Sequence, residues 1–291
     1  MLTYLAVLFA GLLHAVWNAL VARPGGRTGK DAETASGSDD RYIAFAIIGL
    51  TSAVACAPLA LFHVPALPAW PYVITSVVLH IGYTLLLIRC YTVGDFGQVY
   101  PIARGSAPLI VAAVATLLGE HLSLTQLLGL AAVCGGLGAL AIAGRRGAPS
   151  RPALLAALGT GASIAAYTVV DGLGVRRAEG SLGYTAWLFL LEGGLVAAGV
   201  LAVKGGAVMA APRRMWAMSA TGGVVSTLAY GIVVWAQTRS PLAEVAALRE
   251  TGVIWGAVIG AVFFAERLGR RRIAAAAVVA LGVILLNAHP A

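Results

Sequence analysis

Apolar runs alternate with short polar segments along the whole chain. Each run is about 20 residues long, which is the length that an α-helix needs to cross the hydrocarbon core of a bilayer. The pattern predicts ten membrane-spanning helices, at residues 2–22, 42–62, 70–91, 96–118, 122–143, 153–175, 182–203, 215–238, 242–264 and 273–287. We therefore expect an all-α integral membrane protein.

The fourth and ninth predicted spans have related sequences. Residues 98–122 read QVYPIARGSAPLIVAAVATLLGEHL, and a shift of 146 residues aligns them without a gap with residues 244–268, EVAALRETGVIWGAVIGAVFFAERL. The alignment places Arg104 on Glu250, so ionisable residues stand at matching depth in both segments. Duplicated units of membrane helices with such residues are typical of secondary transporters.

The duplication divides the chain into two five-helix repeats. The first covers residues 1–144 and includes a polar loop at 23–40, which is rich in Gly, Ser and Asp and is predicted to be flexible. The second covers residues 151–288. Because each repeat has an odd number of spans, the second enters the membrane from the opposite side. The sequence therefore predicts ten transmembrane helices as two inverted repeats, related by an axis in the membrane plane.

Composition and charge agree with a membrane protein. With 59% hydrophobic and 11% charged residues, the chain has too little polar surface for a soluble protein. The net charge of +8 comes from Lys and Arg between the apolar runs. This placement suits anionic lipid headgroups and argues against nucleic acid as a partner. Fifteen Lys and Arg residues follow odd-numbered spans and three follow even-numbered ones, which predicts both termini on the non-cytoplasmic side.

Enzyme chemistry is not indicated by the sequence. The chain contains no HExxH, GxSxG, P-loop or dinucleotide-binding motif. Cys56, Cys90 and Cys134 lie singly inside apolar runs, where they are expected to pack as small hydrophobic residues. We therefore expect neither an enzyme nor a bound cofactor or metal.

Arg104 and Glu250 are the first candidates for a substrate site. Both lie near the middle of their predicted spans, where an ionisable side chain is costly unless it is paired or faces a wet cavity. Inverted symmetry would bring the two together near the midplane. Pro101 and Pro108 flank Arg104, and each frees a backbone carbonyl, which suits a hinge beside a binding site. The alternative is a structural ion pair that only locks two helices.

The same two spans carry further charged residues. Arg249 stands beside Glu250, about 100° round a continuous helix, so one of the two is expected to point away from the site. Either could be the residue that reaches a substrate. Glu244 begins the same span, where a carboxylate suits the positive end of the helix dipole. Glu120 and Glu266 end their spans at matching places, which indicates a shared turn or packing role.

Polar side chains at helical spacing mark four more spans. They are His14, Trp17 and Asn18 in the first span, His80 and Tyr83 in the third, Tyr167 and Asp171 in the sixth, and Glu192 in the seventh. The alternative for a lone histidine is a packing role. Protonation would relieve the cost of burying a carboxylate, so Glu192 and Glu250 are proton-coupling candidates. Asp171 is close to Arg176 and Arg177 at a helix end, and we expect it at the membrane interface.

Aromatic residues in the spans could line a pocket or lie at the membrane interfaces. Tyr100, Tyr230 and Trp235 join Trp17 and Tyr83 as substrate-binding candidates. The GAVIG run at residues 256–260 brings small residues to one helix face. This would allow close packing either within the chain or in a homodimer.

Three segments give the chain a family resemblance: GLLHAVWNALVAR in the first span, GQVYPIARGSAPLIVAAVATLLGEHLS in the fourth, and AEVAALRETGVIWGAVIGAVFFAERLGRRR in the ninth. The sequence resembles the EamA-type members of the drug/metabolite transporter superfamily, which have ten helices and an internal duplication. The resemblance covers nearly the whole chain. It implies a multi-pass carrier of the inner (plasma) membrane that moves small organic molecules, commonly amino acids or other metabolites, outward through a central cavity between the repeats.

Two features depart from the family pattern. The polar first loop is long, and the charges of Arg104, Arg249, Glu250 and Glu192 are more than a carrier of apolar drugs would need. We therefore expect a secondary transporter that exports an amino-acid-like, zwitterionic or anionic metabolite by alternating access, with proton coupling as a hypothesis. The alternatives are a carrier of amphiphilic or lipid-linked substrates and a non-transporting scaffold subunit.

Overall fold

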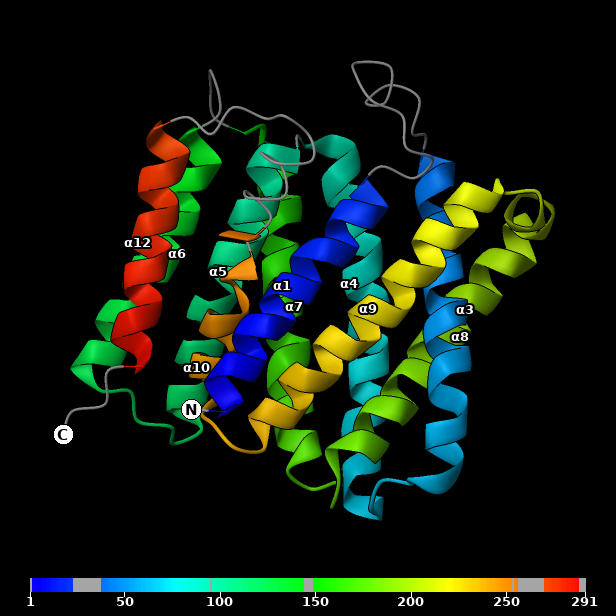
Figure 1. The fold of residues 1–291 in the computed structure, drawn as a ribbon, viewed down its shortest axis with the longest axis horizontal. Helices are drawn as coiled ribbons and strands as arrows, with labels where there is room; N and C mark the ends of the chain where they lie inside the picture. Colours follow the sequence, from blue (N-terminus) through cyan, green and yellow to red (C-terminus); the bar gives the residue numbers. More distant parts are fainter. Residues whose placement is uncertain are drawn as a thin grey trace.

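Helices make up all the regular structure in the described part of the chain (Figure 1). The computed structural model describes residues 2–22, 38–94, 96–143, 149–252, 254–255 and 270–287. The helices are α1 (Leu2–Ala22), α3 (Ser38–Phe62), η1 (Leu67–Ala69), α4 (Trp70–Val93), α5 (Phe96–Leu117), α6 (Leu124–Ala143), α7 (Arg151–Val175), α8 (Ser181–Met209), α9 (Arg213–Gln237), α10 (Leu242–Arg249) and α12 (Arg270–Asn287).

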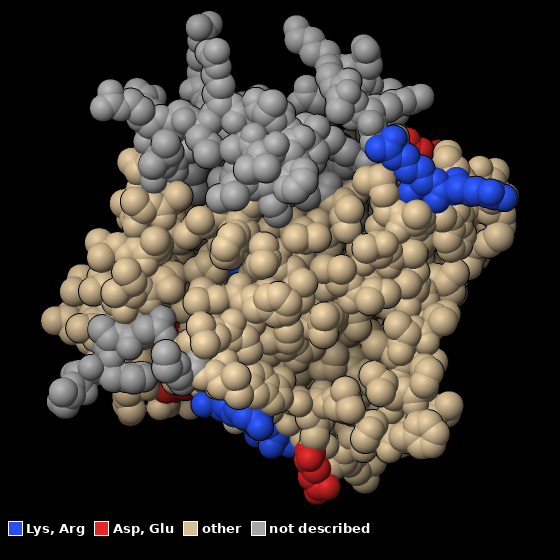
Figure 2. Space-filling view, in the orientation of Figure 1, with Lys and Arg blue, Asp and Glu red and all other residues tan. Residues whose placement is uncertain are grey.

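The length and surface of these helices suit a membrane. Five segments are long and apolar enough to span one: Asp39–Phe62, Leu67–Cys90, Arg151–Val175, Ser181–Met209 and Arg213–Gln237. Shorter apolar segments lie in α1, α5, α6 and α12. Figure 2 shows charged side chains mainly at two opposite ends of the molecule, with a largely uncharged surface between them. Lipid chains rather than water cover such a surface favourably.

Helices from the first half of the chain pack on helices from the second half. α3 packs on α8 and α6 packs on α12, while α1 packs on α9 and α10, and α7 packs on α4 and α5. In chain order, the counterparts in the two halves are α1 and α7, α3 and α8, α4 and α9, α5 and α10, and α6 and α12. Exchanging each helix for its counterpart leaves this set of contacts unchanged. For example, the contact of α1 with α9 becomes the contact of α7 with α4. The order of packing is therefore the same in both halves.

Small residues bring α6 and α12 into close contact. A Cβ added at Gly129 would lie 2.7 Å from the carbonyl oxygen of Gly282, and a Cβ at Gly136 would lie 2.9 Å from that of Ala275. Gly136 is later in α6 but faces an earlier residue of α12, so the two helices run antiparallel. Larger residues at these positions would collide with backbone atoms.

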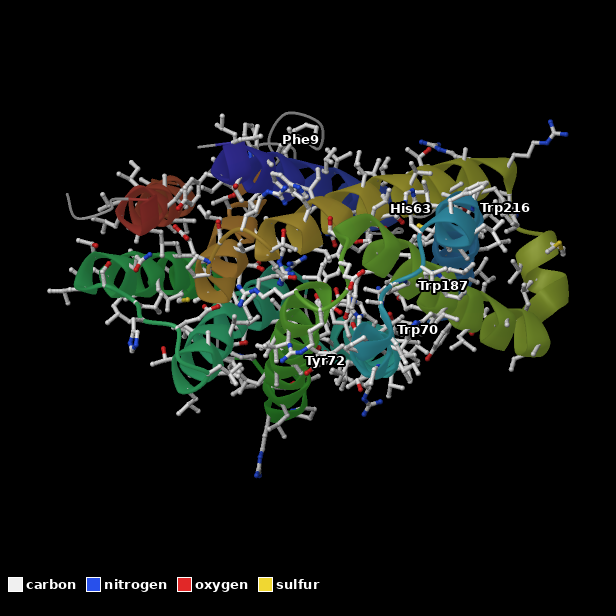
Figure 3. The ribbon with its side chains drawn as sticks, turned by 90° about the horizontal axis from the view of Figure 1, so that it is seen from below. Phe9, His63, Trp70, Tyr72, Trp187 and Trp216 are labelled. Atoms are coloured by element: carbon white, nitrogen blue, oxygen red, sulfur yellow. The ribbon has the colours of Figure 1, made fainter. Side chains whose placement is uncertain are left out.

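α3 and α8 also run antiparallel. Gly49, near the middle of α3, faces Gly193, whose carbonyl oxygen would lie 2.7 Å from an added Cβ. Ala60, later in α3, accepts a hydrogen bond of 3.1 Å from Nε1 of Trp187, earlier in α8. The Trp187 ring meets Trp70 of α4 edge-on, with ring centroids 4.9 Å apart (Figure 3). These contacts hold α3, α4 and α8 together near one end of the helices.

α8 extends beyond its predicted span of 182–203. It ends at Met209, and its backbone leaves helical geometry at Lys204, with φ −131° and ψ 26°. Lys204 forms an ion pair with Asp39 of α3. Trp216 of α9 donates from Nε1 to the carbonyl oxygen of Val208 at 3.2 Å. Tertiary contacts therefore hold an extension that the apolar pattern did not include.

The ninth predicted span, 242–264, is not one continuous helix. α10 ends at Arg249, and Glu250 is its C-cap residue. Helical geometry returns at Gly252 after a turn at Glu250 and Thr251. The prediction of an unbroken helix was therefore wrong. Residues 253 and 256–269, which include Glu266 and the GAVIG run, lie outside the described residues.

Contacts around the turn give a physical reason for the interruption. Thr251 donates from Oγ1 to the carbonyl oxygen of Leu248 at 2.8 Å. Gly252 lies against α1, where an added Cβ would be 2.7 Å from the carbonyl oxygen of Gly11. A residue with a side chain at this position would push α1 away. Hydrophobic periodicity does not report such contacts, because they depend on a helix far away in the sequence.

Candidate substrate site

Three charged side chains meet where α10 is interrupted. Arg104 of α5 donates from Nη1 to Oε1 of Glu250 at 3.2 Å and to Oε2 at 3.4 Å. Arg249 donates from Nε to Oε1 of the same carboxylate at 3.3 Å. The side chains of Arg104, Arg249 and Glu250 are only 4%, 3% and 1% exposed. Two guanidinium groups therefore share one buried carboxylate, and we call these three residues the charged cluster.

The charged cluster agrees with one expectation and corrects another. Arg104 and Glu250, which the sequence alignment places at equivalent positions, do face one another. Arg249 was expected to point away if Glu250 pointed inward, and that expectation was wrong. The direction of a Cβ does not fix the position of a guanidinium group on a long side chain, so neighbouring residues at a helix end can reach one site.

A cavity of about 90 Å³ lies beside the charged cluster, among α1, α3, α4, α7, α8 and α9. Its polar lining consists of His14, Ser52, His80, Tyr83, Thr84, Tyr167, Glu192, Ser226 and Tyr230, and its other lining residues are Trp17, Phe45, Ile48, Gly49, Phe189 and Val196. A space of this size admits a few water molecules or a small polar group. Seven of the lining residues are candidates that the sequence predicted.

Tyr167 on α7 and Tyr230 on α9 form part of the aromatic lining of the cavity. Together with the rings of His80 and Tyr83, which also line it, we call them the aromatic wall. Arg104 and Arg249 are not among the residues that line this cavity.

Ring contacts fix the aromatic wall. The His80 ring stacks on Tyr167 with centroids 4.0 Å apart, and Tyr230 meets His80 edge-on at 5.4 Å. Tyr83 meets Tyr167 edge-on at 5.5 Å. Rings held by such offset and edge contacts have little freedom to move independently. The helical spacing of His80 and Tyr83 therefore places both side chains at the cavity.

The polar side chains predicted to share a face of the first span contact one another on α1. Trp17 donates from Nε1 to Nδ1 of His14 at 3.1 Å, and Asn18 donates from Nδ2 to the carbonyl oxygen of His14 at 2.7 Å. Trp17 and His14 line the cavity, whereas Asn18 does not. An indole nitrogen can only donate, so Nδ1 of His14 is the acceptor and the ring proton is on Nε2. His14 therefore presents a donor at the cavity.

Asp171 is buried in the interior of the helix bundle, a burial that its predicted place at the membrane interface did not anticipate. Its side chain is 0% exposed. The carboxylate accepts hydrogen bonds from the hydroxyl groups of Tyr184, at 2.9 Å, and Tyr230. Proximity in sequence to Arg176 and Arg177 suggested the interface, but the helix turns Asp171 inward toward α8 and α9. Three residues on three helices thus form a buried polar network next to the cavity wall.

The remaining predicted site residues have different surroundings. Glu192 lines the cavity. Trp235 lies near the end of α9, where the Arg239 guanidinium is 4.4 Å from its ring centroid, and it is not a lining residue. Pro108 is buried in α5, which continues as one helix from Phe96 to Leu117. The side chains of Tyr100 and Pro101 lie outside the described part of the structure.

Glu120 makes a contact that the sequence did not reveal. Its Oε1 and Oε2 atoms accept hydrogen bonds from the backbone N–H of Leu242 at 3.1 and 2.9 Å, so Glu120 caps the start of α10. Arg176 donates to Glu120 at 3.4 Å and to the carbonyl oxygen of Gln237 at 2.9 Å. Glu244 lies in the first turn of α10, as expected. The partner of Glu120 is 122 residues away, so only the fold could identify it.

Metal binding finds no support in the described ranges. No group of three or more His, Cys, Asp or Glu side chains there is placed to hold a metal ion. Cys56, Cys90 and Cys134 are free thiols, of which the first two are buried. The chemistry that these residues offer is therefore charge, hydrogen bonding and aromatic packing.

Residues 151–288 match the EamA-like transporter family, which is part of the drug/metabolite transporter superfamily. The matched segment is just under half of the chain. A protein crystal structure is also similar to the chain, with a TM-score of 0.72 and 16% sequence identity over 98% of this chain and 98% of that chain. At this identity the likeness shows a shared fold alone. No curated protein matches the chain.

The match to the EamA-like family agrees with the apolar helices of the structure. The chain is accordingly a multi-pass membrane protein, and the family indicates a transporter of the drug/metabolite type. The matched EamA-like residues include α7 to α10 and α12, which supply Tyr167, Tyr230, Arg249 and Glu250. The family match thus covers two of the three residues of the charged cluster and six of the fifteen residues that line the cavity.

Proposed function

We propose that this EamA-like protein is a secondary transporter that exports a small polar metabolite, amino-acid-like and zwitterionic or anionic, across the inner membrane by alternating access. The observation that carries the proposal is the charged cluster beside a polar and aromatic cavity. Ionisable side chains are costly inside a membrane, and they persist there mainly where they serve a substrate or ion pathway. A helix interruption at the same place is how many transporters build such a site.

Two inverted five-helix repeats, at 1–144 and 151–288, are part of this proposal. The packing order of the helices is the same in both halves. Gly136 and Gly282 occupy equivalent positions in the sequence alignment, and each packs closely on the other repeat's helix. Because α6 and α12 run antiparallel, equivalent helices have opposite directions. Rocking of one repeat against the other would open the site to each side in turn, with Pro101 and Pro108 as hinge residues.

The charged cluster and the cavity would divide the recognition of a substrate. Arg104 or Arg249 would bind a carboxylate or phosphonate by charge-assisted hydrogen bonds. Glu250 or Glu192 would bind an amino group or a proton. The aromatic residues Trp17, Tyr83, Tyr100, Tyr167, Tyr230 and Trp235, together with His14, Asn18 and His80, would surround the rest of the molecule.

Orientation in the membrane follows from the basic residues. We place both termini on the non-cytoplasmic side, so that Lys204, Arg213 and Arg214 face the cytoplasm. The lipid bilayer is then the only obligatory partner besides the substrate. A homodimer through the GAVIG run is a second, separate proposal that cross-linking in liposomes would test.

Proteoliposome transport tests the proposed function. Detergent-purified protein is first screened by thermal shift against amino acids, phosphonates, quaternary amines and sugars. Exchange of radiolabelled L-alanine and L-glutamate is then measured in liposomes as zwitterionic and anionic probes. Arg104→Ala should abolish exchange while the protein remains folded.

Three outcomes separate the alternatives. Unchanged exchange by the Arg104→Ala variant would remove this residue from the site. Stabilisation by quaternary amines or amphiphiles alone would favour an amphiphilic carrier. Failure of every probe, both as a stabiliser and in exchange, would favour the scaffold subunit.

A further inference from the structure

The buried carboxylate of Asp171 is linked to a histidine through one tyrosine. Hydroxyl groups of Tyr184 and Tyr230 donate to its two oxygen atoms. These donors are both neutral. The ring of Tyr230 meets that of His80 on α4 edge-on, with centroids 5.4 Å apart. A carboxylate that is 0% exposed thus has, beyond one of its donors, a basic side chain that can gain or lose a charge.

The hydrogen bonds of His80 determine which of its nitrogen atoms can take a proton. Nδ1 lies 3.0 Å from the carbonyl oxygen of Ser76 and 3.1 Å from its Oγ. A carbonyl oxygen can only accept, so Nδ1 is the donor and Nε2 carries the lone pair. The ring of His80 lines the cavity, which gives Nε2 a route to water.

The groups around this pair come from every neighbouring helix. They are Tyr184 and Glu192 on α8, Tyr230 on α9, Tyr167 on α7 itself, and, beyond Tyr167, Arg104 on α5 with Arg249 and Glu250 at the end of α10. Glu192 lies on the cavity side and its charge also acts on His80. His80 is therefore placed between two carboxylates, one sealed in the interior and one at the cavity.

We propose that His80 binds the coupling proton on Nε2 and that Asp171 is its buried counter-charge. This inference rests on the proposed transport function and identifies the coupling site within it. One proton from the aqueous phase converts the neutral imidazole to imidazolium, whose charge Asp171 balances across the ring of Tyr230. The same proton leaves to the opposite aqueous phase when the transporter has changed its orientation. Asp171 touches no cavity space, so it acts as a positioning residue.

The geometry also explains how proton and substrate would be coupled. Tyr167 stacks on His80 at 4.0 Å and is within range of the charges of Arg249, Arg104 and Glu250. Tyr230 donates to Asp171 and is within range of Arg249. The same two rings thus contact the proton site and face the charged cluster. A substrate that displaces them must disturb the surroundings of His80.

The test compares driven transport with exchange in proteoliposomes. Radiolabelled L-alanine and L-glutamate serve as probes, and accumulation driven by a pH gradient is divided by the rate of exchange without a gradient. Asp171→Asn should lower this ratio by at least about tenfold, because an uncompensated imidazolium is disfavoured in a buried site. Tyr184→Phe is the matched control. It removes one hydroxyl from the same carboxylate but keeps the charge, and its ratio should stay near that of the wild type.

Two results in this experiment would overturn the proposal. An unchanged ratio in Asp171→Asn would show that the carboxylate has no part in coupling. An equal loss in Tyr184→Phe would show that only the hydrogen-bond network matters. Accumulation that follows a sodium gradient and ignores pH would also exclude the proton.

A second measurement does not depend on any substrate. Nuclear magnetic resonance of histidine-labelled protein in nanodiscs follows the five histidines, and His80→Gln identifies the signal of His80. That signal should change with pH in the wild-type protein, and the change should differ in Asp171→Asn because the buried counter-charge is gone. A signal that ignores pH, or that is the same in both proteins, would overturn the site even if no probe is transported. If the signal behaves as expected and no probe is exchanged, the proton site stands and the transport function fails.

Discussion

Nη1 of Arg104 lies 3.2 Å from Oε1 of Glu250, although the two residues are 146 positions apart in the chain. That separation equals the offset between the two related segments of the sequence. The ion pair therefore joins equivalent positions of the two halves, at the contact of α5 with α10. Arg249 adds a second cation to the same carboxylate.

Replacing the whole charged cluster separates a structural role from a transport role. Glu250→Leu alone leaves two buried guanidinium groups without the carboxylate that they share, and such a loss destabilises by about 3–5 kcal/mol. In the triple variant Arg104→Met, Arg249→Met, Glu250→Leu, no charge of the cluster remains. Its thermal unfolding midpoint should return close to that of the wild type, because apolar replacement of buried ion pairs is often neutral. Exchange of L-alanine and L-glutamate should still be absent, and exchange at the wild-type rate would contradict the transport role.

Glu120 should stabilise α10 by capping its first turn from a distant part of the chain. Glu120→Ala removes the acceptor for the backbone N–H of Leu242 and the partner of Arg176. We expect a loss of about 1 kcal/mol, the usual cost of losing a helix N-cap. Thermal unfolding in detergent measures the loss. Glu120→Gln retains an acceptor oxygen and should lose less, so equal losses in both variants would mean that the charge, and not the cap, is what matters.

The α6–α12 contact predicts opposite effects for two glycines of one helix. Gly129→Ala brings a Cβ to 2.7 Å from the carbonyl oxygen of Gly282, and overpacking of this kind costs about 1–3 kcal/mol. Among the described residues, no atom outside the neighbouring backbone of α6 lies within 4 Å of a Cβ added at Gly135. Gly135→Ala should therefore be neutral or stabilise by up to about 1 kcal/mol, since alanine favours a helix more than glycine does. Comparable unfolding midpoints for both variants would show that the helices do not approach as closely as described.

Cysteine labelling tests the orientation in the membrane. In a background without Cys56, Cys90 and Cys134, a single cysteine at Glu179 should react with a membrane-impermeant maleimide added to intact cells. One at Gly205, next to Lys204, should react only in inverted vesicles, because the basic ends are placed in the cytoplasm. The reverse labelling pattern would show that the protein has the opposite orientation in the membrane, with the same fold.

Much of the fold was predictable because single helices depend on local sequence. The apolar runs predicted α1, α3 to α7 and α9 to within a few residues. The limits of this reasoning appear at α8 and α10. The extension of α8 past Lys204 depends on Asp39, and the turn after Arg249 depends on close contact with Gly11. Periodicity within one segment carries no information about either partner.

The site was predicted unevenly for the same reason. The internal duplication indicated that Arg104 would meet Glu250, since equivalence between repeats is visible as an alignment. Helical spacing indicated that His14 and Trp17, or His80 and Tyr83, would share a face. The burial of Asp171 was missed because its partners Tyr184 and Tyr230 come from two other helices. Two arginines in its own sequence neighbourhood suggested the wrong surroundings.

The sequence by itself determined that this is a membrane protein of apolar helices with a repeated unit and a short set of intramembrane charges. Apolar length, charge and repetition are properties of the chain that no packing arrangement alters. The tertiary structure decided which charges are shared, where the ninth span is interrupted, and that Tyr167 and Tyr230 line the cavity while Arg104 and Arg249 do not. These features arise from contacts between helices that are distant in the chain, and their energies depend on distances of a few ångströms that the order of residues does not specify.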